Sequence, residues 1–438
     1  MIPASPILGD DVYEPVDGVV RSSTLAQRPS GAADLGLDRA RRRTVRPSPR
    51  PHVVVAARLF RPEPAAAAYR LGSMVRVLAR RGVDVTVLTT RPPRPVRGEV
   101  WGEPSVRVKR WPVLRDAGGN VRGYVQFASF DIPLLWRLLT CRRPDVVVAE
   151  PPPTTGAVVR LIAGARRIPY VYYAADVSSP AAAGMGVASA VVWLLRRVES
   201  WVMRGAVSVL AVSSGVVREV EALGVDPERV RLVGTGVDTE LFCPGELPPH
   251  EDATLVYAGT MSEVHGAEVF VRAFARVAGE MPQARLIMLG QGTERQELEE
   301  LAERLVPGRV DFEGLVGSAQ VTWALRGARA GLASVRPGRG YDFAFPTKMF
   351  VSTACGTPVI YSGVGPGSAM VEKQALGWAV DWDVDQVADA MMAALSEPPS
   401  PTRRASLVTW TADHASQSRV AEVAAGEVLE AGRHVLVD

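Results

Sequence analysis

Short apolar runs alternate with longer amphipathic stretches from residue 52 onward. Val53–Ala57 and Val83–Leu88 have the length of buried strands, and Ala65–Arg81 between them carries its apolar residues at helical spacing. The same alternation predicts further strands at 145–148, 170–173, 207–212 and 231–233. Strands that alternate with helices indicate an α/β fold with a doubly wound parallel sheet.

A break divides this pattern into two halves. Cys243–Ala253 holds three prolines and no apolar period, which is typical of a linker. Apolar runs then resume at 254–259, 284–289, 310–314, 331–335 and 357–363, and a helical pattern closes the chain over 405–431. We therefore predict two Rossmann-like domains, 49–245 and 246–404, that face each other across a cleft. We expect 1–48 to be a flexible extension and 405–438 to be a closing helix that packs back on the first domain.

Composition and charge exclude several classes of protein. Among 438 residues, 47% are hydrophobic and 22% charged, which is a globular composition. The three cysteines lie far apart, so neither a disulfide framework nor a paired-cysteine metal site is expected. The net charge of +3 is too small to indicate a nucleic-acid partner. Because the first residues also lack the pattern of a signal peptide, we expect a cytoplasmic protein.

One long stretch carries no charge. It runs from Ala181 to Leu195 and is closed by Arg196 and Arg197. A helix needs about 20 apolar residues to span a bilayer, so this run is too short. It predicts a buried or interfacial helix, and any membrane contact is expected to be peripheral at most.

The strongest chemical signal lies between Arg336 and Pro358. Ligands of open parallel sheets bind beyond the carboxyl ends of the strands, and this segment follows a predicted strand. Arg336 and Arg339 lie in a glycine-rich loop, and Pro346–Thr347–Lys348 then begins a helix. A helix N-terminus suits phosphate and normally disfavours lysine, so Lys348 indicates an anionic ligand.

The segment FPTKMFVSTACGTPVI resembles the donor-site helix of glycosyltransferase family 4, whose members have the GT-B fold. Other family-like segments follow in family order between about residues 52 and 395, among them FRPEPAAAAYR, AADVSSP, LVYAGTMSEVHGAEVFVRAF and LIMLGQGTERQEL. The resemblance implies that a nucleotide-diphosphate sugar binds the second domain and an acceptor binds the first. It implies transfer with retention of configuration, without a metal or a further cofactor.

The resemblance also implies a set of site residues. Asp176 and Lys348 are the expected catalytic residues, and Glu63 and Arg70 are expected at the acceptor. The expected donor-binding residues are Gly259, Thr260, His265, Gly290, Gln291, Gly292, Arg336, Arg339, Asp342, Pro346, Thr347, Lys348 and Val351. For Asp176 a helix N-cap is the alternative. The acidic segment DWDVD at 381–385 is interpreted as the start of a helix, and Cys355 as packed core.

The sequence departs from the family at important positions. The two family glutamates that are separated by seven residues correspond to Phe343 and Val351, and Val351 cannot hold ribose hydroxyls. Thr260 and His265 stand where an arginine and a lysine usually bind the diphosphate. One branch of the family lacks that pair and begins its donor helix with Pro-Ser-Lys. We therefore expect Lys348, with Arg336 or Arg339, to supply the charge, and Asp342 to replace the first glutamate.

Several functions fit these observations. The leading hypothesis is transfer from a UDP- or GDP-sugar to a small-molecule acceptor in bacterial specialised (antibiotic) metabolism, since only three of 50 basic residues are lysine. The alternatives are a lipid-linked or cell-envelope acceptor, S-glycosylation of a small thiol as in lincosamide-type pathways, a non-catalytic GT-B partner protein and a sugar-nucleotide epimerase. A homodimer is left open.

Overall fold

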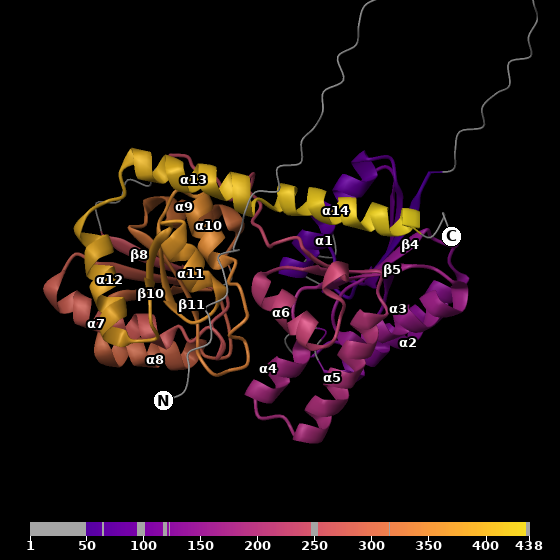
Figure 1. Cartoon of the computed structure of the whole chain (residues 1–438). Helices are drawn as coiled ribbons and strands as arrows, with labels where there is room; N and C mark the ends of the chain where they lie inside the picture. Colours follow the sequence, from indigo (N-terminus) through magenta and orange to yellow (C-terminus); the bar gives the residue numbers. More distant parts are fainter. Residues whose placement is uncertain are drawn as a thin grey trace, which may run out of the picture. The chain divides into compact units, whose positions relative to one another are not determined.

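The computed structural model describes residues 50–63, 65–93, 101–116, 121, 123–246, 253–314 and 316–434. They belong to a compact unit that begins at Arg50 and contains two parallel sheets flanked by helices (Figure 1). The extension predicted at 1–48 and the middle of the predicted linker lie outside the described residues. None of the described helices is both long and apolar enough to cross a membrane.

The first sheet has seven parallel strands in the order β3-β2-β1-β4-β5-β6-β7. The strand order reverses between β1 and β4, which is where open α/β sheets bind ligands. The strands are β1 (His52–Ala56), β2 (Asp84–Thr90), β3 (Val106–Trp111), β4 (Val146–Ala149), β5 (Tyr170–Ala174), β6 (Ser208–Ala211) and β7 (Val230–Leu232). β3 was not predicted because it is a half-buried edge strand in which valines alternate with basic residues.

The helices of the first half show a local cause for two of their ends. They are α1 (Ala66–Arg80), α2 (Tyr124–Thr140), α3 (Pro153–Arg166), α4 (Ser178–Gly184), α5 (Ser189–Arg204) and α6 (Ser214–Ala222), with the short 3-10 helix η2 (Pro227–Arg229). Gly82, at φ +79°, follows the end of α1. The Ser213 hydroxyl accepts a hydrogen bond from the Val216 amide at the start of α6. Both boundaries confirm the sequence pattern.

The second sheet has six parallel strands in the order β10-β9-β8-β11-β12-β13, and its strand order reverses between β8 and β11. The strands are β8 (Thr254–Ala258), β9 (Arg285–Leu289), β10 (Val310–Glu313), β11 (Ala330–Val335), β12 (Val359–Gly363) and β13 (Gly377–Val380). The helices are α7 (Glu268–Glu280), α8 (Arg295–Leu305), α9 (Ser318–Gly327), α10 (Lys348–Ala354), α11 (Pro366–Lys373) and α12 (Val384–Ser396). The fold prediction of two Rossmann-like domains is confirmed.

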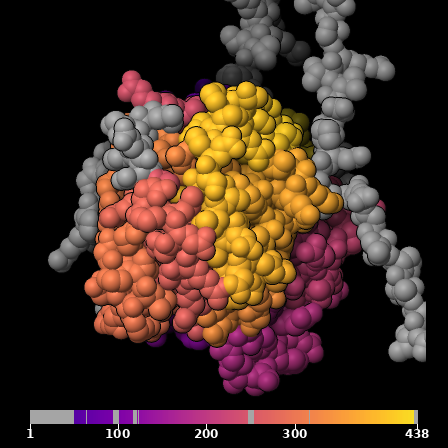
Figure 2. All heavy atoms as spheres, turned by 90° about the vertical axis from the view of Figure 1, so that its left-hand side faces the viewer, coloured from indigo at the N-terminus to yellow at the C-terminus, as the bar shows by residue number. Residues whose placement is uncertain are grey.

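Two smaller predictions in the second half are also confirmed. The Asp383 carboxylate accepts hydrogen bonds from the amides of Asp385 and Gln386, so DWDVD forms the N-cap of α12. Cys355 is 2% exposed and packs in the core. Helix α12 packs against α7, and Figure 2 shows the surface of the second half with these residues in gold and coral.

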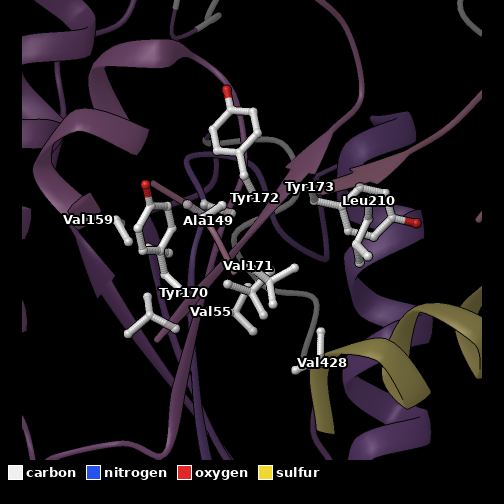
Figure 3. Close-up of a cluster of buried hydrophobic side chains, with 14 of the residues drawn as sticks. Val55, Ala149, Val159, Tyr170, Val171, Tyr172, Tyr173, Leu210 and Val428 are labelled. Carbon is white, nitrogen blue, oxygen red and sulfur yellow. The ribbon is translucent and has the colours of Figure 1, made fainter. Parts of the chain in front are cut away.

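The C-terminal helix predicted over 405–431 is wrong as a single element. The chain forms α13 (Pro401–Ala415) and α14 (Gln417–His434), with Ser416 in an extended conformation between them. Val237 interrupts the helix because its amide donates to the Ala415 carbonyl at 2.9 Å and its carbonyl accepts from the Gln417 amide at 2.8 Å. Helix α14 packs against α1 and β4, and Figure 3 shows Val428 of α14 beside Val55 and Val171.

The uncharged run 181–195 also forms two helices. Gly186, at φ +73°, lies in the turn between α4 and α5, where a right-handed helix cannot continue. Met185 is 57% exposed and Trp193 is 58% exposed. The expectation of a buried helix is therefore wrong, and the interfacial alternative is the one that agrees with the exposure of these side chains.

Candidate functional site

The predicted donor loops meet at the carboxyl ends of the second sheet. Gly259 and Thr260 follow β8, Arg336 follows β11, and the turn Gly290–Gln291–Gly292 follows β9. The Gly259 amide donates to the Leu289 carbonyl, and the Arg336 amide donates to the Val264 carbonyl, both at 2.9 Å. Sheet topology thus assembles residues that are up to 80 positions apart in sequence, because β8 and β11 are neighbours at the point where the strand order reverses.

Two glycines of these loops are required by close packing. Gly259 has φ +148°, and a Cβ atom there would collide with the Lys348 side chain. Gly290 has φ +130°, and a Cβ atom there would collide with the Gly259 carbonyl. The glycines of the two family-like motifs therefore have a structural role, because they let the β8 loop, the β9 loop and Lys348 pack closely together.

Lys348 is the first residue of α10, and its amine points back to the β8 loop. Its Nζ donates to the Tyr257 hydroxyl and, at 3.3 Å, to the Thr260 carbonyl, and it lies 4.2 Å from the centroid of the Tyr257 ring. Among the residues that the structure describes, Lys348 makes no ion pair with a carboxylate. Loss of hydration lowers its pKa well below the ordinary lysine value. An anionic ligand would restore the charged form.

The N-terminus of α10 contributes less to a phosphate site than the sequence predicted. Helix α10 has only seven residues, and Thr347 at its N-cap makes no side-chain capping bond. Pro346 is buried before it. A short helix has a weak macrodipole, so the phosphate argument rests on the Lys348 amine.

The two arginines of the β11 loop are not free charges. Arg336 donates to Glu268 and lies 3.7 Å from Glu294, and Arg339 lies 3.4 Å from Glu263. These three glutamates were not among the predicted site residues, although they follow the same strands as the predicted donor loops. Both arginines thus share their positive charge with neighbouring carboxylates. Donor contact by Arg336 and Arg339 stays a prediction.

His265 supplies no charge near neutral pH. Its Nδ1 lies 2.9 Å from the Ser262 hydroxyl. Burial, and secondarily the nearby Lys348 amine, lower the pKa of His265 to about 3. His265 is therefore a neutral hydrogen-bonding group, and Lys348 is the cation of this cluster that has no carboxylate partner among the described residues.

The positions of the two missing family glutamates have different surroundings. Phe343 is 8% exposed and packs with the hydrophobic core of the first half, while Val351 packs partly buried between two core clusters of the second. The exposed Asp342 carboxylate accepts from the Gly338 amide at 3.2 Å and so holds its own loop. Ribose contact by Asp342 or Val351 stays a prediction.

The first half gathers a second polar cluster beyond β1, β4 and β5. Arg70 of α1 and Glu150 after β4 form an ion pair at 2.5 Å, with side chains 13% and 5% exposed. Arg58 follows β1 and stacks on Phe127 of α2 at 4.0 Å. Burial raises the pKa of Glu150, and Arg70 opposes that rise. Arg58 and Glu150 were not among the predicted site residues, although both directly follow predicted strands.

Glu63 lies in a separate buried contact. Its carboxylate pairs with Arg115 at 2.9 Å and accepts from the Thr90 hydroxyl at 3.2 Å. Both predicted acceptor residues, Glu63 and Arg70, are thus engaged with protein partners. Their contact with an acceptor stays a prediction. Their ion pairs with Arg115 and Glu150 also give them a structural role.

Asp176 does not cap α4, so that alternative is wrong. The amides of Ser178 and Ser179 instead donate to Glu199 of α5, at 2.6 and 3.1 Å. The Asp176 side chain is left exposed after β5. Loss of hydration around its carboxylate raises the pKa of Asp176 above the ordinary aspartate value, while Arg70 and Arg58 lower it. Its catalytic role stays a prediction.

Tyr257→Phe tests whether the tyrosine positions Lys348. The Tyr257 hydroxyl donates to the Thr260 carbonyl at 2.7 Å and accepts from Lys348. We expect UDP affinity to fall about threefold to tenfold, since one hydrogen bond is worth about 1 kcal/mol. Calorimetric titration measures this change.

Tyr361→Phe is the matched control. Its hydroxyl donates to the Val364 carbonyl at 2.7 Å, three residues on, in the same local arrangement and with no lysine bonded to it. Equal loss of affinity in both variants would show that the effect is a general one on the sheet and not on Lys348.

Val351→Glu tests where the nucleotide ribose lies. Because Val351 packs among apolar side chains, we expect the new carboxylate to lower the melting temperature, at a cost of about 1–3 kcal/mol, and to leave UDP binding no tighter. Val351→Gln has the same shape without the charge and separates the two contributions. Tighter UDP binding with an unchanged melting temperature would instead indicate a ribose within reach of position 351.

Comparison with known proteins agrees with this geometry. The chain matches the "Glycosyl transferase 4-like domain" over residues 65–236 and the "Glycosyl transferases group 1" domain over residues 252–397. Its two halves thus match two successive domains of GT4-like glycosyltransferases. The family prediction is confirmed at this level, while the branch with a Pro-Ser/Thr-Lys helix start stays a prediction.

Relatives and solved structures support the same family and fold. D-inositol 3-phosphate glycosyltransferase of Kribbella flavida is 31% identical over 193 residues, which cover 40% of this chain and 45% of the relative. The chain thus spans about half the length of the curated relatives it matches. Sucrose-phosphate synthase from Thermosynechococcus elongatus has a TM-score of 0.71 at 18% identity, covering 87% of this chain and 98% of the other. HepE of Anabaena in complex with UDP and glucose has a TM-score of 0.64 at 14% identity, covering 86% and 99%. The predicted GT-B fold is confirmed.

Proposed function

We propose that this protein transfers a sugar from a nucleotide-diphosphate donor to a small-molecule acceptor, with retention of configuration. The observation that carries the proposal is the Lys348 amine, which lies beyond β8 and β11 and, within the described part of the chain, has hydroxyl and carbonyl partners but no carboxylate. Such an amine favours a diphosphate. The UDP and glucose in the structure of HepE support the choice of a UDP-sugar as the first donor to test.

In the proposed reaction, the bond between the anomeric carbon and the diphosphate breaks, and a bond to the acceptor oxygen, nitrogen or sulfur forms. Lys348 stabilises the charge that develops on the leaving diphosphate. The acceptor proton passes to Asp176, which follows β5 at the carboxyl end of the first sheet. We further propose a cytoplasmic setting and a specialised-metabolite acceptor.

A donor screen tests the proposal. The full chain is mixed with UDP-glucose, UDP-N-acetylglucosamine or GDP-mannose, and release of UDP or GDP is measured with and without candidate acceptors. We expect thermal stabilisation by one nucleoside diphosphate and release of that nucleotide from the matching sugar. Stabilisation without any release in Asp176→Asn and wild type alike would instead support a non-catalytic binding protein.

Turnover is expected to survive excess EDTA. Lys348 can neutralise a leaving diphosphate, and in the described part of the chain no three His, Cys, Asp or Glu side chains are grouped as metal ligands. The measurement is nucleotide release before and after chelation. Loss of activity that magnesium or manganese restores would contradict the metal-independent mechanism.

A further inference from the structure

Helix α2 exposes an apolar stripe as well as burying one. Phe130, Leu134 and Leu138 face the core and are at most 2% exposed. On the opposite side, Ile132, Leu135, Trp136 and Leu139 follow the spacing i, i+3, i+4, i+7, and Ile132 and Trp136 are 72% and 67% exposed. Tyr124 and Val125 extend the exposed apolar surface at the start of the helix. A helix that needs only one buried face does not require this second stripe.

The run 181–195, which carries no charge, places further exposed apolar side chains on α5, a helix of the same packed group as α2 and α3. Helix α3 packs against both α2 and α5 (Figure 1). The guanidinium of Arg160 on α3 stacks on Trp201 of α5 at 4.4 Å. At the start of α5, Val191, Trp193 and Leu194 are exposed. We call the exposed apolar side chains of α2, α3 and α5 the α2–α5 face. Its members are Tyr124, Val125, Ile132, Leu135, Trp136, Leu139, Leu161, Val191, Trp193, Leu194 and Trp201.

The exposed charged side chains of helices α2, α3 and α5 are all basic. Helices α2, α3 and α5 contain two carboxylates, Asp131 and Glu199, which are 5% and 1% exposed and bond to Thr155 and to the start of α4. The exposed arginines of these helices and of the loops that follow them are Arg142, Arg143, Arg167, Arg196, Arg197 and Arg204. By contrast, α8 in the second half exposes Glu297, Glu300 and Glu303. The α2–α5 face is therefore apolar and basic without an exposed acid on its helices.

From this combination we infer that the α2–α5 face docks on an anionic phospholipid bilayer. Tryptophan and tyrosine favour the boundary between lipid and water, aliphatic side chains enter the outer acyl region, and arginines attract acidic headgroups. A contact of this kind lies on the surface, since no described helix is long and apolar enough to cross a membrane.

A bilayer on the α2–α5 face would also lie close to the polar cluster that contains Arg58, Arg70 and Glu150. The same helix α2 carries Phe127 and Asp131 on its inner side, where Arg58 stacks on Phe127 and Thr155 donates to Asp131. The bilayer would thus contact the outer side of the helix that closes the candidate acceptor site. This statement depends on the proposed function, whereas the bilayer contact itself does not.

Vesicle sedimentation tests the inference with the full chain. The vesicles are phosphatidylcholine alone, or phosphatidylcholine with about one third phosphatidylglycerol. We expect wild type to sediment with the anionic vesicles, to show a blue-shifted tryptophan emission there, and to remain in solution with the neutral ones. Ile132→Glu/Trp136→Glu and Arg196→Glu/Arg197→Glu should each reduce the bound fraction at least about fivefold, with melting temperatures close to wild type.

Trp323→Glu is the matched control, because Trp323 is an exposed tryptophan on α9 of the second half. It should bind vesicles as wild type does. All variants keep the same residues before Arg50, so a contribution from that segment cannot produce a difference between them. Equal binding by all variants, or wild type that stays in solution with both vesicles, would overturn the inference.

A second copy of the chain is the other occupant that the experiment detects. If wild type ran as a dimer in gel filtration, became a monomer in Ile132→Glu/Trp136→Glu and did not sediment with anionic vesicles, the face would be a self-association surface. That result would also overturn the inference. Nucleotide release in solution is measured in parallel and should be unchanged in both face variants, so failure of docking and failure of the proposed function are distinguishable.

Discussion

Lys348→Met is expected to weaken UDP binding by about tenfold to a hundredfold, or about 1.5–3 kcal/mol. Methionine keeps most of the side-chain length that packs under Gly259 but removes the amine that bonds to Tyr257 and Thr260. Calorimetric titration of UDP measures the loss. Lys373→Met, at an exposed lysine that ends α11, is the control and should leave the affinity unchanged.

The pH dependence gives this prediction a second readout. In the free protein the pKa of Lys348 lies below its ordinary value, and a bound diphosphate raises it. Below the free-state pKa the lysine is charged with or without ligand, so affinity is greatest there. Above it, binding must take up a proton, and the affinity falls as pH rises toward the bound-state pKa. Titrations in two buffers with different ionisation enthalpies should show proton uptake in wild type that Lys348→Met lacks.

The largest expected loss of stability follows from Arg70→Met. This change leaves Glu150, which is 5% exposed, without its counter-ion, and breaking a buried pair in this way costs about 3–5 kcal/mol. Urea denaturation at pH 7 measures it. The loss should shrink as pH falls, because Glu150 has a raised pKa in the folded state and its penalty is present only where the unfolded carboxyl is ionised.

Two comparisons make the Arg70 prediction specific. Arg70→Met/Glu150→Leu removes both charges and should recover most of the lost stability. Arg81→Met breaks the exposed pair with Glu422 between α1 and α14, and should cost at most about 1 kcal/mol. If the single and double Arg70 variants were equally unstable, the loss would come from packing of the arginine side chain instead of from an unpaired carboxylate.

Apolar patterning predicted the central strands well because a parallel strand that is covered on both sides must be apolar throughout. Each predicted strand is present, with bounds within two residues of the expected ones. Of the four edge strands, β7 and β10 were predicted and β3 and β13 were not; β3 alternates valines with basic residues, and β13 is a half-buried segment of four residues. Helix α14 could not be separated from α13 by pattern, since the break at Ser416 comes from backbone hydrogen bonds with Val237, about 180 residues away.

The sequence by itself determined the two α/β halves, the order of the donor loops and the presence of a lysine after Pro346 and Thr347. These features depend on local periodicity and on which residues follow each strand. Only the tertiary structure decided which charges are available. It pairs Arg336 with Glu268, Arg339 with Glu263 and Arg70 with Glu150, while Lys348 donates to a hydroxyl and a carbonyl and has no carboxylate partner among the residues that are described. The physical reason is that the charge at a site depends on neighbours brought together by strand order, and those neighbours are distant in sequence.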